Sequence, residues 1–212
     1  MASSDIDICS QALELLGIPA ISSFDENPVA ATCQRFYDTT INYLLGRYPW
    51  RFAQKTAQLD RQANDPVAHW KFQYTFPTDI VAPGVYALFE SNRTGTNPIK
   101  DYTLGLNDQQ QAVILSDRRE LWMVYTIRLP EAQWPPHFYR LAVFAMAAIL
   151  AIPLTEDPDK DSVWQAKAYG TPQEGGEGGF LANAKRIDAQ QAPAAPIQDY
   201  TLMQAHQGGL RG

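Results

Sequence analysis

The sequence contains very little cysteine, which limits two common kinds of stabilisation. Only Cys9 and Cys33 occur among its 212 residues. No CxxC pair or Cys/His grouping is present, so a structural zinc ion would lack ligands. Both cysteines fall on the apolar faces of predicted helices, where a free thiol behaves as a small hydrophobic side chain. We therefore expect two buried free thiols and no disulfide.

Basic residues are also scarce. The chain has 17 lysines and arginines against 23 aspartates and glutamates, which gives a formal net charge of -6. This is the wrong sign for a protein whose affinity comes from neutralising phosphates, so nucleic acid is not expected as a ligand. Asp5 and Asp7 stand where a signal peptide would carry basic residues, and we expect assembly in a reducing cytoplasm.

Long apolar runs are missing as well. The longest, residues 141–154, is shorter than the roughly 20 residues that a membrane span needs. It predicts a buried helix, with no membrane among the partners. Hydrophobic residues make up 45% of the chain, which is ordinary for a globular protein and argues against disorder throughout.

The known ligand-binding and catalytic motifs are incomplete. Asp157, Asp159 and Asp161 imitate the start of a calcium-binding loop, but Ser162 replaces its glycine and Ala168 its bidentate glutamate. We interpret the three carboxylates as favourable charges at the start of a helix.

Phosphate-binding and hydrolase motifs are missing their essential residues too. The glycine cluster of residues 175–179 lacks the lysine and hydroxyl of a phosphate-binding loop and is interpreted as a flexible loop. His69, His137 and His206 are scattered along the chain, and no GxSxG elbow is present. The sequence therefore predicts no catalytic residue, no metal and no cofactor, as in a protein that is not an enzyme.

Hydrophobic periodicity predicts helices at both ends of the chain. Ser4 caps a first helix that ends before Gly17, and Asn27 caps a second that begins at Pro28 and ends near Tyr48. Further helical segments are predicted from residues 135–136 until Pro153, after residues 157–158, and over residues 180–187.

From about residue 52 to residue 128, short runs rich in valine, tyrosine, phenylalanine and threonine replace the helical pattern. Prolines and glycines bound these runs, as they commonly bound strands. The clearest unit has an apolar run at residues 112–116, a polar turn at 117–120 and an alternating run at 121–129. This arrangement predicts an antiparallel hairpin.

These patterns together predict an α+β fold. A mainly α-helical bundle of about four helices comprises residues 1–51 and 134–188. An antiparallel β lobe is inserted at residues 52–133, and residues 189–212 form an extended C-terminal arm.

Two groups of residues stand out as candidate contact sites in this arrangement. Tyr48, Trp50 and Phe52 are expected where the bundle meets the β lobe, as core and interface residues. The arm has too little apolar surface to fold alone. Its residues Ile197, Tyr200 and Leu202 have polar neighbours, a pattern suited to an extended segment that orders against a partner.

Four segments, in their order and spacing, resemble the head-to-tail adaptor family of tailed phages, also called tail tubular protein A. The resemblance spans most of the chain, and it is the ordered combination that makes it specific. The segments are ALELLG at residues 12–17, ISSFDE at 21–26, YPWRFA at 48–53 and YTFPTD at 74–79.

This resemblance implies a structural virion protein at the head-tail junction. Copies would stand side by side in a ring, commonly a dodecamer, that joins the capsid portal to a tail nozzle or another tail protein. The ring would extend the DNA channel, and its acidic wall would let DNA pass without specific binding. The family's C-terminal segment reaches onto the portal, so the candidate docking residues are Ile197, Tyr200, Leu202 and Met203. Residues 170–179 depart from the family pattern, because glycines interrupt its continuous fourth helix.

Two other classes of function remain open at this point. One is a monomeric small-ligand binding module or hydrolase, with a pocket between the bundle and the β lobe. The other is a nucleic-acid binder that stacks bases on its aromatic groups, which predicts a DNA affinity that falls steeply with salt.

Overall fold

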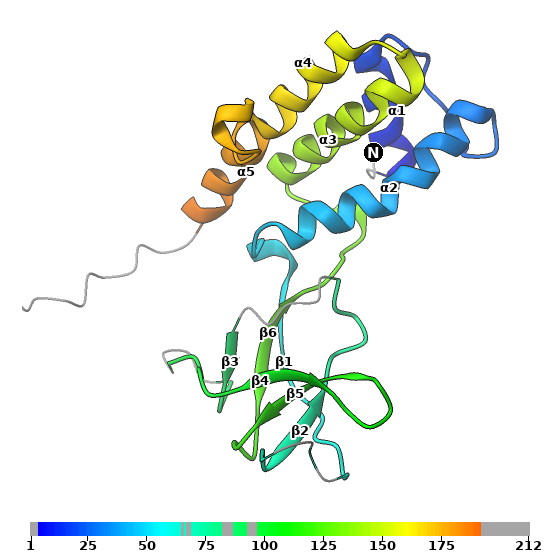
Figure 1. The fold of residues 1–212 in the computed structure, drawn as a ribbon. Helices are drawn as coiled ribbons and strands as arrows, with labels where there is room; N and C mark the ends of the chain where they lie inside the picture. The colour runs from blue at the N-terminus through cyan, green and yellow to red at the C-terminus, as the bar shows by residue number, and fades with distance from the viewer. Residues whose placement is uncertain (1–3, 65, 67–68, 82–86, 93–96, 192–212) are drawn as a thin grey trace, which may run out of the picture.

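The computed structural model describes residues 4–64, 66, 69–81, 87–92 and 97–191. Within these ranges the fold is α+β, with five α-helices and two small antiparallel sheets. The helices pack together in one part of the molecule and the strands in the other, and we call these parts the helical body and the β lobe (Figure 1). The predicted α+β class is confirmed, whereas the predicted number of about four helices is one too few.

The first two helices begin at the predicted capping residues. Ser4 accepts a hydrogen bond from the backbone N–H of Asp7, and Asn27 accepts one from the N–H of Ala30. Gly17 ends the first helix in the left-handed conformation that glycine adopts without strain. The five helices are α1 (Asp5–Leu16), α2 (Pro28–Gly46), α3 (Pro136–Thr155), α4 (Pro158–Tyr169) and α5 (Gly179–Gln190).

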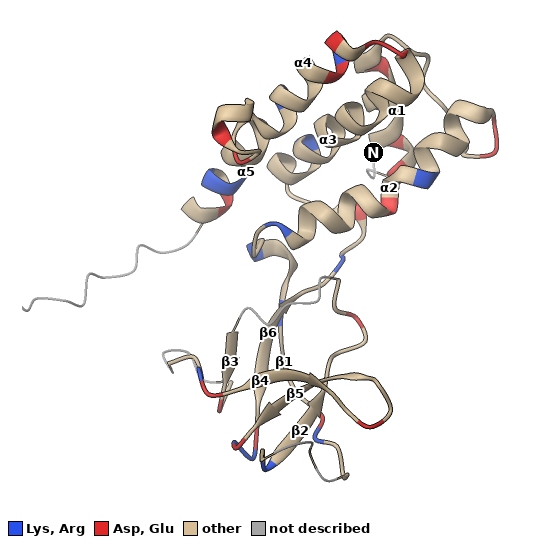
Figure 2. Ribbon diagram, in the orientation of Figure 1, with Lys and Arg blue, Asp and Glu red and all other residues tan. Residues whose placement is uncertain are grey.

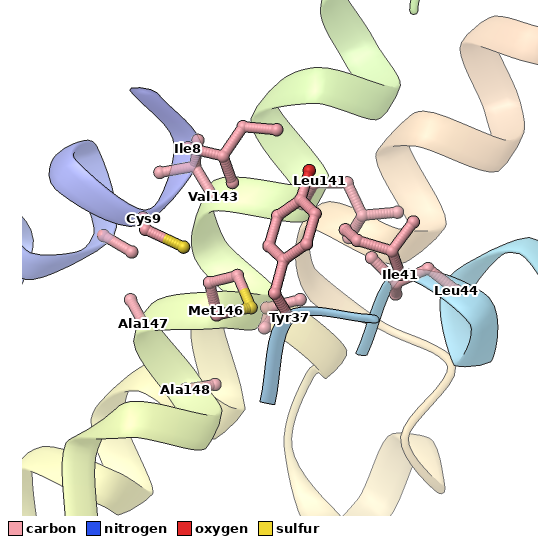
Figure 3. Close-up of a cluster of buried hydrophobic side chains, with 14 of the residues drawn as sticks. Ile8, Cys9, Tyr37, Ile41, Leu44, Leu141, Val143, Met146, Ala147 and Ala148 are labelled. Carbon is pink, nitrogen blue, oxygen red and sulfur yellow. The ribbon is translucent and has the colours of Figure 1, made fainter. Parts of the chain in front are cut away.

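Helix α3 forms the centre of the helical body. It contacts each of the other four helices, and most of its apolar side chains are buried. Figure 3 shows Met146 of α3 in the main apolar cluster together with Cys9 of α1 and Tyr37 of α2. Both Cys9 and Cys33 are buried free thiols, as predicted.

Helix α3 does not stop at Pro153, contrary to the prediction. It continues to Thr155, and Glu156 then caps it in the left-handed conformation with its N–H on the carbonyl of Ile152. Proline removes the hydrogen bond to the carbonyl four residues earlier, that of Ile149, and its ring crowds that carbonyl. The side chain of Ile149 is partly exposed, so this position of the helix faces outward, where water can serve the carbonyl.

In the described part of the chain, α3 is also the one helix long and apolar enough to cross a membrane by length and composition. The helix is longer than the apolar run of residues 141–154. Length alone therefore does not decide between a buried helix and a membrane span. More than half of its apolar window, 56%, is buried inside the protein. The buried core helix of a globular protein passes the same test, so this is weak evidence for a membrane span.

The β lobe consists of two three-stranded antiparallel sheets. The first has the order β1-β6-β3, formed by β1 (Gln54–Gln58), β6 (Trp122–Thr126) and β3 (Ala87–Phe89). The second has the order β2-β5-β4, formed by β2 (Phe72–Thr75), β5 (Ala112–Ser116) and β4 (Thr103–Leu106). Short 3-10 helices lie at η1 (Arg51–Ala53), η2 (Glu131–Gln133) and η3 (Pro172–Glu174).

The predicted hairpin is wrong, because β5 and β6 belong to different sheets. β5 pairs with β2 and β4, while β6 pairs with β1 and β3. The turn between them is tied to β2, since Asp117 accepts a hydrogen bond from the N–H of Lys71 and the carbonyl of Arg118 accepts one from the Tyr74 hydroxyl. Four consecutive residues of β5 are buried, which is the pattern of a strand covered on both faces.

Each part of the molecule has its own apolar core. Residues of both sheets form the smaller one, in which Tyr74 and Ile114 of one sheet meet Met123 and Tyr125 of the other. The larger core draws on all five helices and includes Trp50, which precedes the first strand.

Candidate functional site

The four proposed portal-docking residues, Ile197, Tyr200, Leu202 and Met203, lie outside the described residues. The described chain ends at Gln191, immediately after α5. We predicted that the arm begins at residue 189, but α5 continues to Gln190. Residues 189 and 190 therefore belong to the helix.

The predicted junction aromatics lie in the segment that joins α2 to β1. Trp50 is buried in the helical body, and its indole N–H donates a hydrogen bond to the carbonyl of Leu44 at 2.8 Å. Its ring packs edge-on against the rings of Tyr48 and Phe138. Phe52 contacts the same Phe138 ring, with 4.8 Å between centroids. The segment is thus anchored on the first turn of α3 at the point where the chain leaves for β1.

A buried carboxylate, missed in the sequence analysis, fixes α5 to the same segment. Asp188 is fully buried, and each of its two oxygens accepts a hydrogen bond from the backbone N–H of Arg51 at 3.2 Å. Such partners are needed because a charge loses its hydration when it leaves water. A sequence signal was present, since Leu181, Ala184 and Asp188 share the buried stripe of α5 and an acidic residue is unusual there.

His137 faces this carboxylate from the first turn of α3. Its Nε2 lies 3.8 Å from an oxygen of Asp188, which is too long for a hydrogen bond, and it has no hydrogen-bond partner among the described residues. Burial lowers the pKa of His137, although the Asp188 carboxylate acts in the opposite direction. The histidine is therefore mainly neutral at pH 7, and α5 meets α3 here without a full ion pair.

Residues 170–179, of which 175–179 were expected to form a flexible loop, form a compact connection between α4 and α5. Arg47, the residue that follows α2, donates a hydrogen bond to the carbonyl of Gly176 at 2.9 Å and pairs with Glu177. Lys185 of α5 pairs with the same Glu177. Glycine is required where backbones cross, because a Cβ atom on Gly179 would lie 2.5 Å from the carbonyl oxygen of Lys167. The glycines therefore let α5 fold back against α4.

One polar cluster in the β lobe has the residue types of a catalytic site. The Lys55 ammonium lies 2.6 Å from the carboxylate of Asp79, whose other oxygen accepts a hydrogen bond from the Tyr125 hydroxyl at 2.8 Å. The hydrogen bond to Asp79 raises the pKa of Lys55, and that from Lys55 lowers the pKa of Asp79. Burial raises the pKa of Tyr125. All three pKa values move away from neutral pH, whereas a residue in acid–base catalysis works best with a pKa near the working pH. We interpret the cluster as a structural ion pair.

The other candidate ligands have structural partners. Asp157 caps α4 by accepting hydrogen bonds from the N–H groups of Asp159 and Lys160, which confirms the helix-start interpretation. His69 stacks on Trp70, with 5.1 Å between the ring centroids. Within residues 4–64, 66, 69–81, 87–92 and 97–191, no group of three histidines, cysteines or acidic residues is placed to hold a metal. His206 lies beyond these ranges.

Comparison with models of known protein families and with curated proteins finds no match to this chain.

Proposed function

We propose that this chain is a structural, non-enzymatic virion protein that forms a ring between the capsid portal and the tail. The ring is homo-oligomeric, a dodecamer according to the resemblance, and assembles in the host cytoplasm. It contacts the portal on one side and a tail nozzle or another tail protein on the other. DNA passes through its channel without specific binding, and no cofactor or metal takes part.

The observation that carries this proposal is the ordered set of four segments that resembles the head-to-tail adaptor family. In this fold they lie where the chain changes direction. Residues 12–17 end α1, 21–26 lead into α2, 48–53 join α2 to β1, and 74–79 leave β2. Two of the segments lie in the helical body, one in the β lobe and one between the two parts, so the resemblance involves both parts of the molecule.

The anchored junction supports the same role. A ring subunit held between two other rings must keep its two parts in a fixed orientation. The packing of Trp50 on Phe138 and the hydrogen bonds of Asp188 to Arg51 hold the exit towards the β lobe against α3 and α5. The net charge of -6 adds a physical reason for passage of DNA, because the chain offers few strong phosphate sites.

The test is to mix the purified chain with the portal of the same particle and to image the product by negative-stain electron microscopy. We expect an additional ring of density stacked on the portal, together with a matching increase in mass in solution. A chain that stays monomeric in the presence of the portal contradicts the proposal. DNA affinity that falls steeply between 50 and 200 mM salt, as it does for proteins that neutralise several phosphates, contradicts the claim of passage without binding.

A further inference from the structure

Arg140 is an isolated charge on the central helix. It is the only lysine, arginine or acidic residue in the 20 residues of α3. Its side chain is exposed, and its guanidinium stacks on the rings of Phe144 and Phe180, 5.7 and 4.8 Å from their centroids. In the described part of the chain no carboxylate forms an ion pair with it. Stacking fixes the position of the guanidinium and leaves its N–H groups free for an acidic partner.

Two grooves meet at Arg140. One, of about 520 Å³, lies between α1 and α3 and is lined by Leu15, which is 40% exposed, and by Glu14. The other, of about 390 Å³, lies between α3 and α5 and is lined by Phe180 and Ile187. We call this surface the arginine face, made of Leu15, Arg140, Phe144, Phe180 and Ile187.

A third groove lies on the other side of the same helix. Its volume is about 580 Å³, and it lies between α2 and α4, with Tyr43, Ile149 and Tyr169 among its lining residues. Ile149 follows Arg140 by about two and a half helical turns, so their side chains point to opposite sides of α3. Tyr43 is 53% exposed and Ile149 38% exposed.

An unpaired carboxylate lies on α4 near the residues of that helix that line this groove. Asp161 precedes Gln165 and Tyr169 by about one and two turns of α4, so it shares their side of the helix. Gln165 and Tyr169 line the groove. No described residue forms an ion pair with Asp161. Figure 2 shows acidic residues, next to a basic one, at the start of α4, and basic colour on α3. We call this second surface the aspartate face, made of Tyr43, Ile149, Asp161, Gln165 and Tyr169.

We propose that the arginine face of one copy packs against the aspartate face of the next, with Arg140 paired to Asp161, and that this contact closes the ring. The inference rests on the proposed function and names its lateral interface. A second copy is the occupant because a head-to-tail contact requires two different faces on opposite sides of the subunit. These faces meet that requirement, since each has partly exposed apolar side chains, and the unpaired Arg140 of one is opposite in charge to the unpaired Asp161 of the other.

Charge reversal at each face tests the proposal on the full chain. Arg140→Glu and Asp161→Arg should each raise, by about tenfold or more, the protein concentration at which half of the chains are in rings on the portal. The double variant, with the charges exchanged, should assemble within about threefold of the unmodified chain. Arg119→Glu and Asp108→Arg make the same charge changes on exposed β-lobe residues and serve as matched controls.

Mixing the two single variants gives a sharper result. In an equimolar mixture, the glutamate introduced by Arg140→Glu in one copy meets the arginine introduced by Asp161→Arg in the next. The unchanged pair of Arg140 and Asp161 forms at the following interface. Rings should therefore return in the mixture and contain equal amounts of both variants by mass spectrometry. Far-ultraviolet circular dichroism and thermal unfolding of each variant show that loss of rings does not reflect loss of fold.

The outcomes separate this inference from the proposed function. If the unmodified chain forms rings on the portal and the single variants do so equally well, the assignment of the two faces is wrong and the proposed function stands. The same holds if neither the double variant nor the mixture restores rings. If the unmodified chain forms no ring, the proposed function fails and the lateral contact fails with it.

Discussion

The carboxylate of Asp188 and the imidazole of His137 face each other at 3.8 Å in the interior, where α5 crosses the start of α3. The same carboxylate accepts the hydrogen bonds of Arg51 at the exit towards β1. One buried side chain therefore connects the last described helix, the central helix and the entry to the β lobe. Substitution of Asp188 is therefore expected to loosen the packing of α5 at this end of the helical body.

Removal of this carboxylate should lower stability. Asp188→Ala leaves the N–H of Arg51 without its acceptor, which costs about 1–3 kcal/mol in the free energy of unfolding. Asp188→Asn keeps one acceptor oxygen and should cost less. Denaturant unfolding gives both values, and the exposed Asp25→Ala should change stability by less than about 0.5 kcal/mol. Equal stability of Asp188→Ala and Asp25→Ala would show that the hydrogen bonds contribute nothing.

The buried histidine should make stability depend on pH. Burial lowers the pKa of His137 below its ordinary value of 6.5, so the unfolded chain binds a proton more readily than the folded one. The contribution of neutral His137 to the free energy of unfolding is complete above about pH 6.5. It is lost as the pH falls through the lower pKa that His137 has in the folded chain.

His137→Gln should flatten this decline in the free energy of unfolding between pH 7 and pH 5. The change in slope is at most about 1.4 kcal/mol per pH unit, the effect of one proton. His69→Gln, at an exposed position, is the control and should leave the slope as it is. An identical slope in His137→Gln and the unmodified chain would falsify the role assigned to His137.

The compact glycine segment predicts very different effects of two similar substitutions. Gly175 and Gly179 both have positive φ angles, 61° and 58°, so alanine at either site costs about 1 kcal/mol in backbone strain. A Cβ atom on Gly175 meets nothing within 4 Å, whereas one on Gly179 lies 2.5 Å from the carbonyl of Lys167. Gly179→Ala should therefore lose at least about 2 kcal/mol more than Gly175→Ala in urea unfolding. Similar losses would mean that α4 and α5 separate easily here.

Local signals were enough to predict where most helices begin. Ser4, Asn27 and Asp157 each cap a helix within three residues of themselves, so the sequence pattern contains the whole interaction. The end of α3 was harder, because Pro153 favours a stop, yet the helix continues past it for two residues near the surface. The fifth helix was predicted only over residues 180–187, whereas it spans Gly179–Gln190. The glycines before it did not reveal how tightly this part of the chain packs.

Pairing of the strands could not be predicted in the same way. The polar turn between β5 and β6 has the pattern of a hairpin, yet β6 pairs with strands that begin at Gln54 and Ala87. The choice between these pairings is decided by the core shared between the two sheets, which no local pattern contains.

The candidate site could be predicted only in part, because some of its contacts join residues that are far apart in the sequence. The aromatic residues around Trp50 were recognisable from their clustering in the chain. The partner of Asp188 is a backbone N–H 137 residues away, and its side chain alone does not reveal which buried donor it meets. Arg140 and Asp161 each look like ordinary surface charges until the fold places them on opposite sides of α3.

The boundary of α5 decides how the arm should be tested. A deletion from residue 189 would remove the last residues of the helix next to the buried Asp188, so attachment and stability would change together. Deletion of residues 192–212 leaves the helix whole. We expect it to abolish attachment to the portal while the thermal unfolding midpoint shifts by less than about 2 °C. Pull-down on immobilised portal and calorimetry measure the two effects.

A variant of unchanged length, in which Ile197, Tyr200, Leu202 and Met203 are all replaced by serine, should also fail to attach, because the apolar contacts are lost. Attachment of the deleted chain at the level of the intact one would show that the portal is bound by another surface.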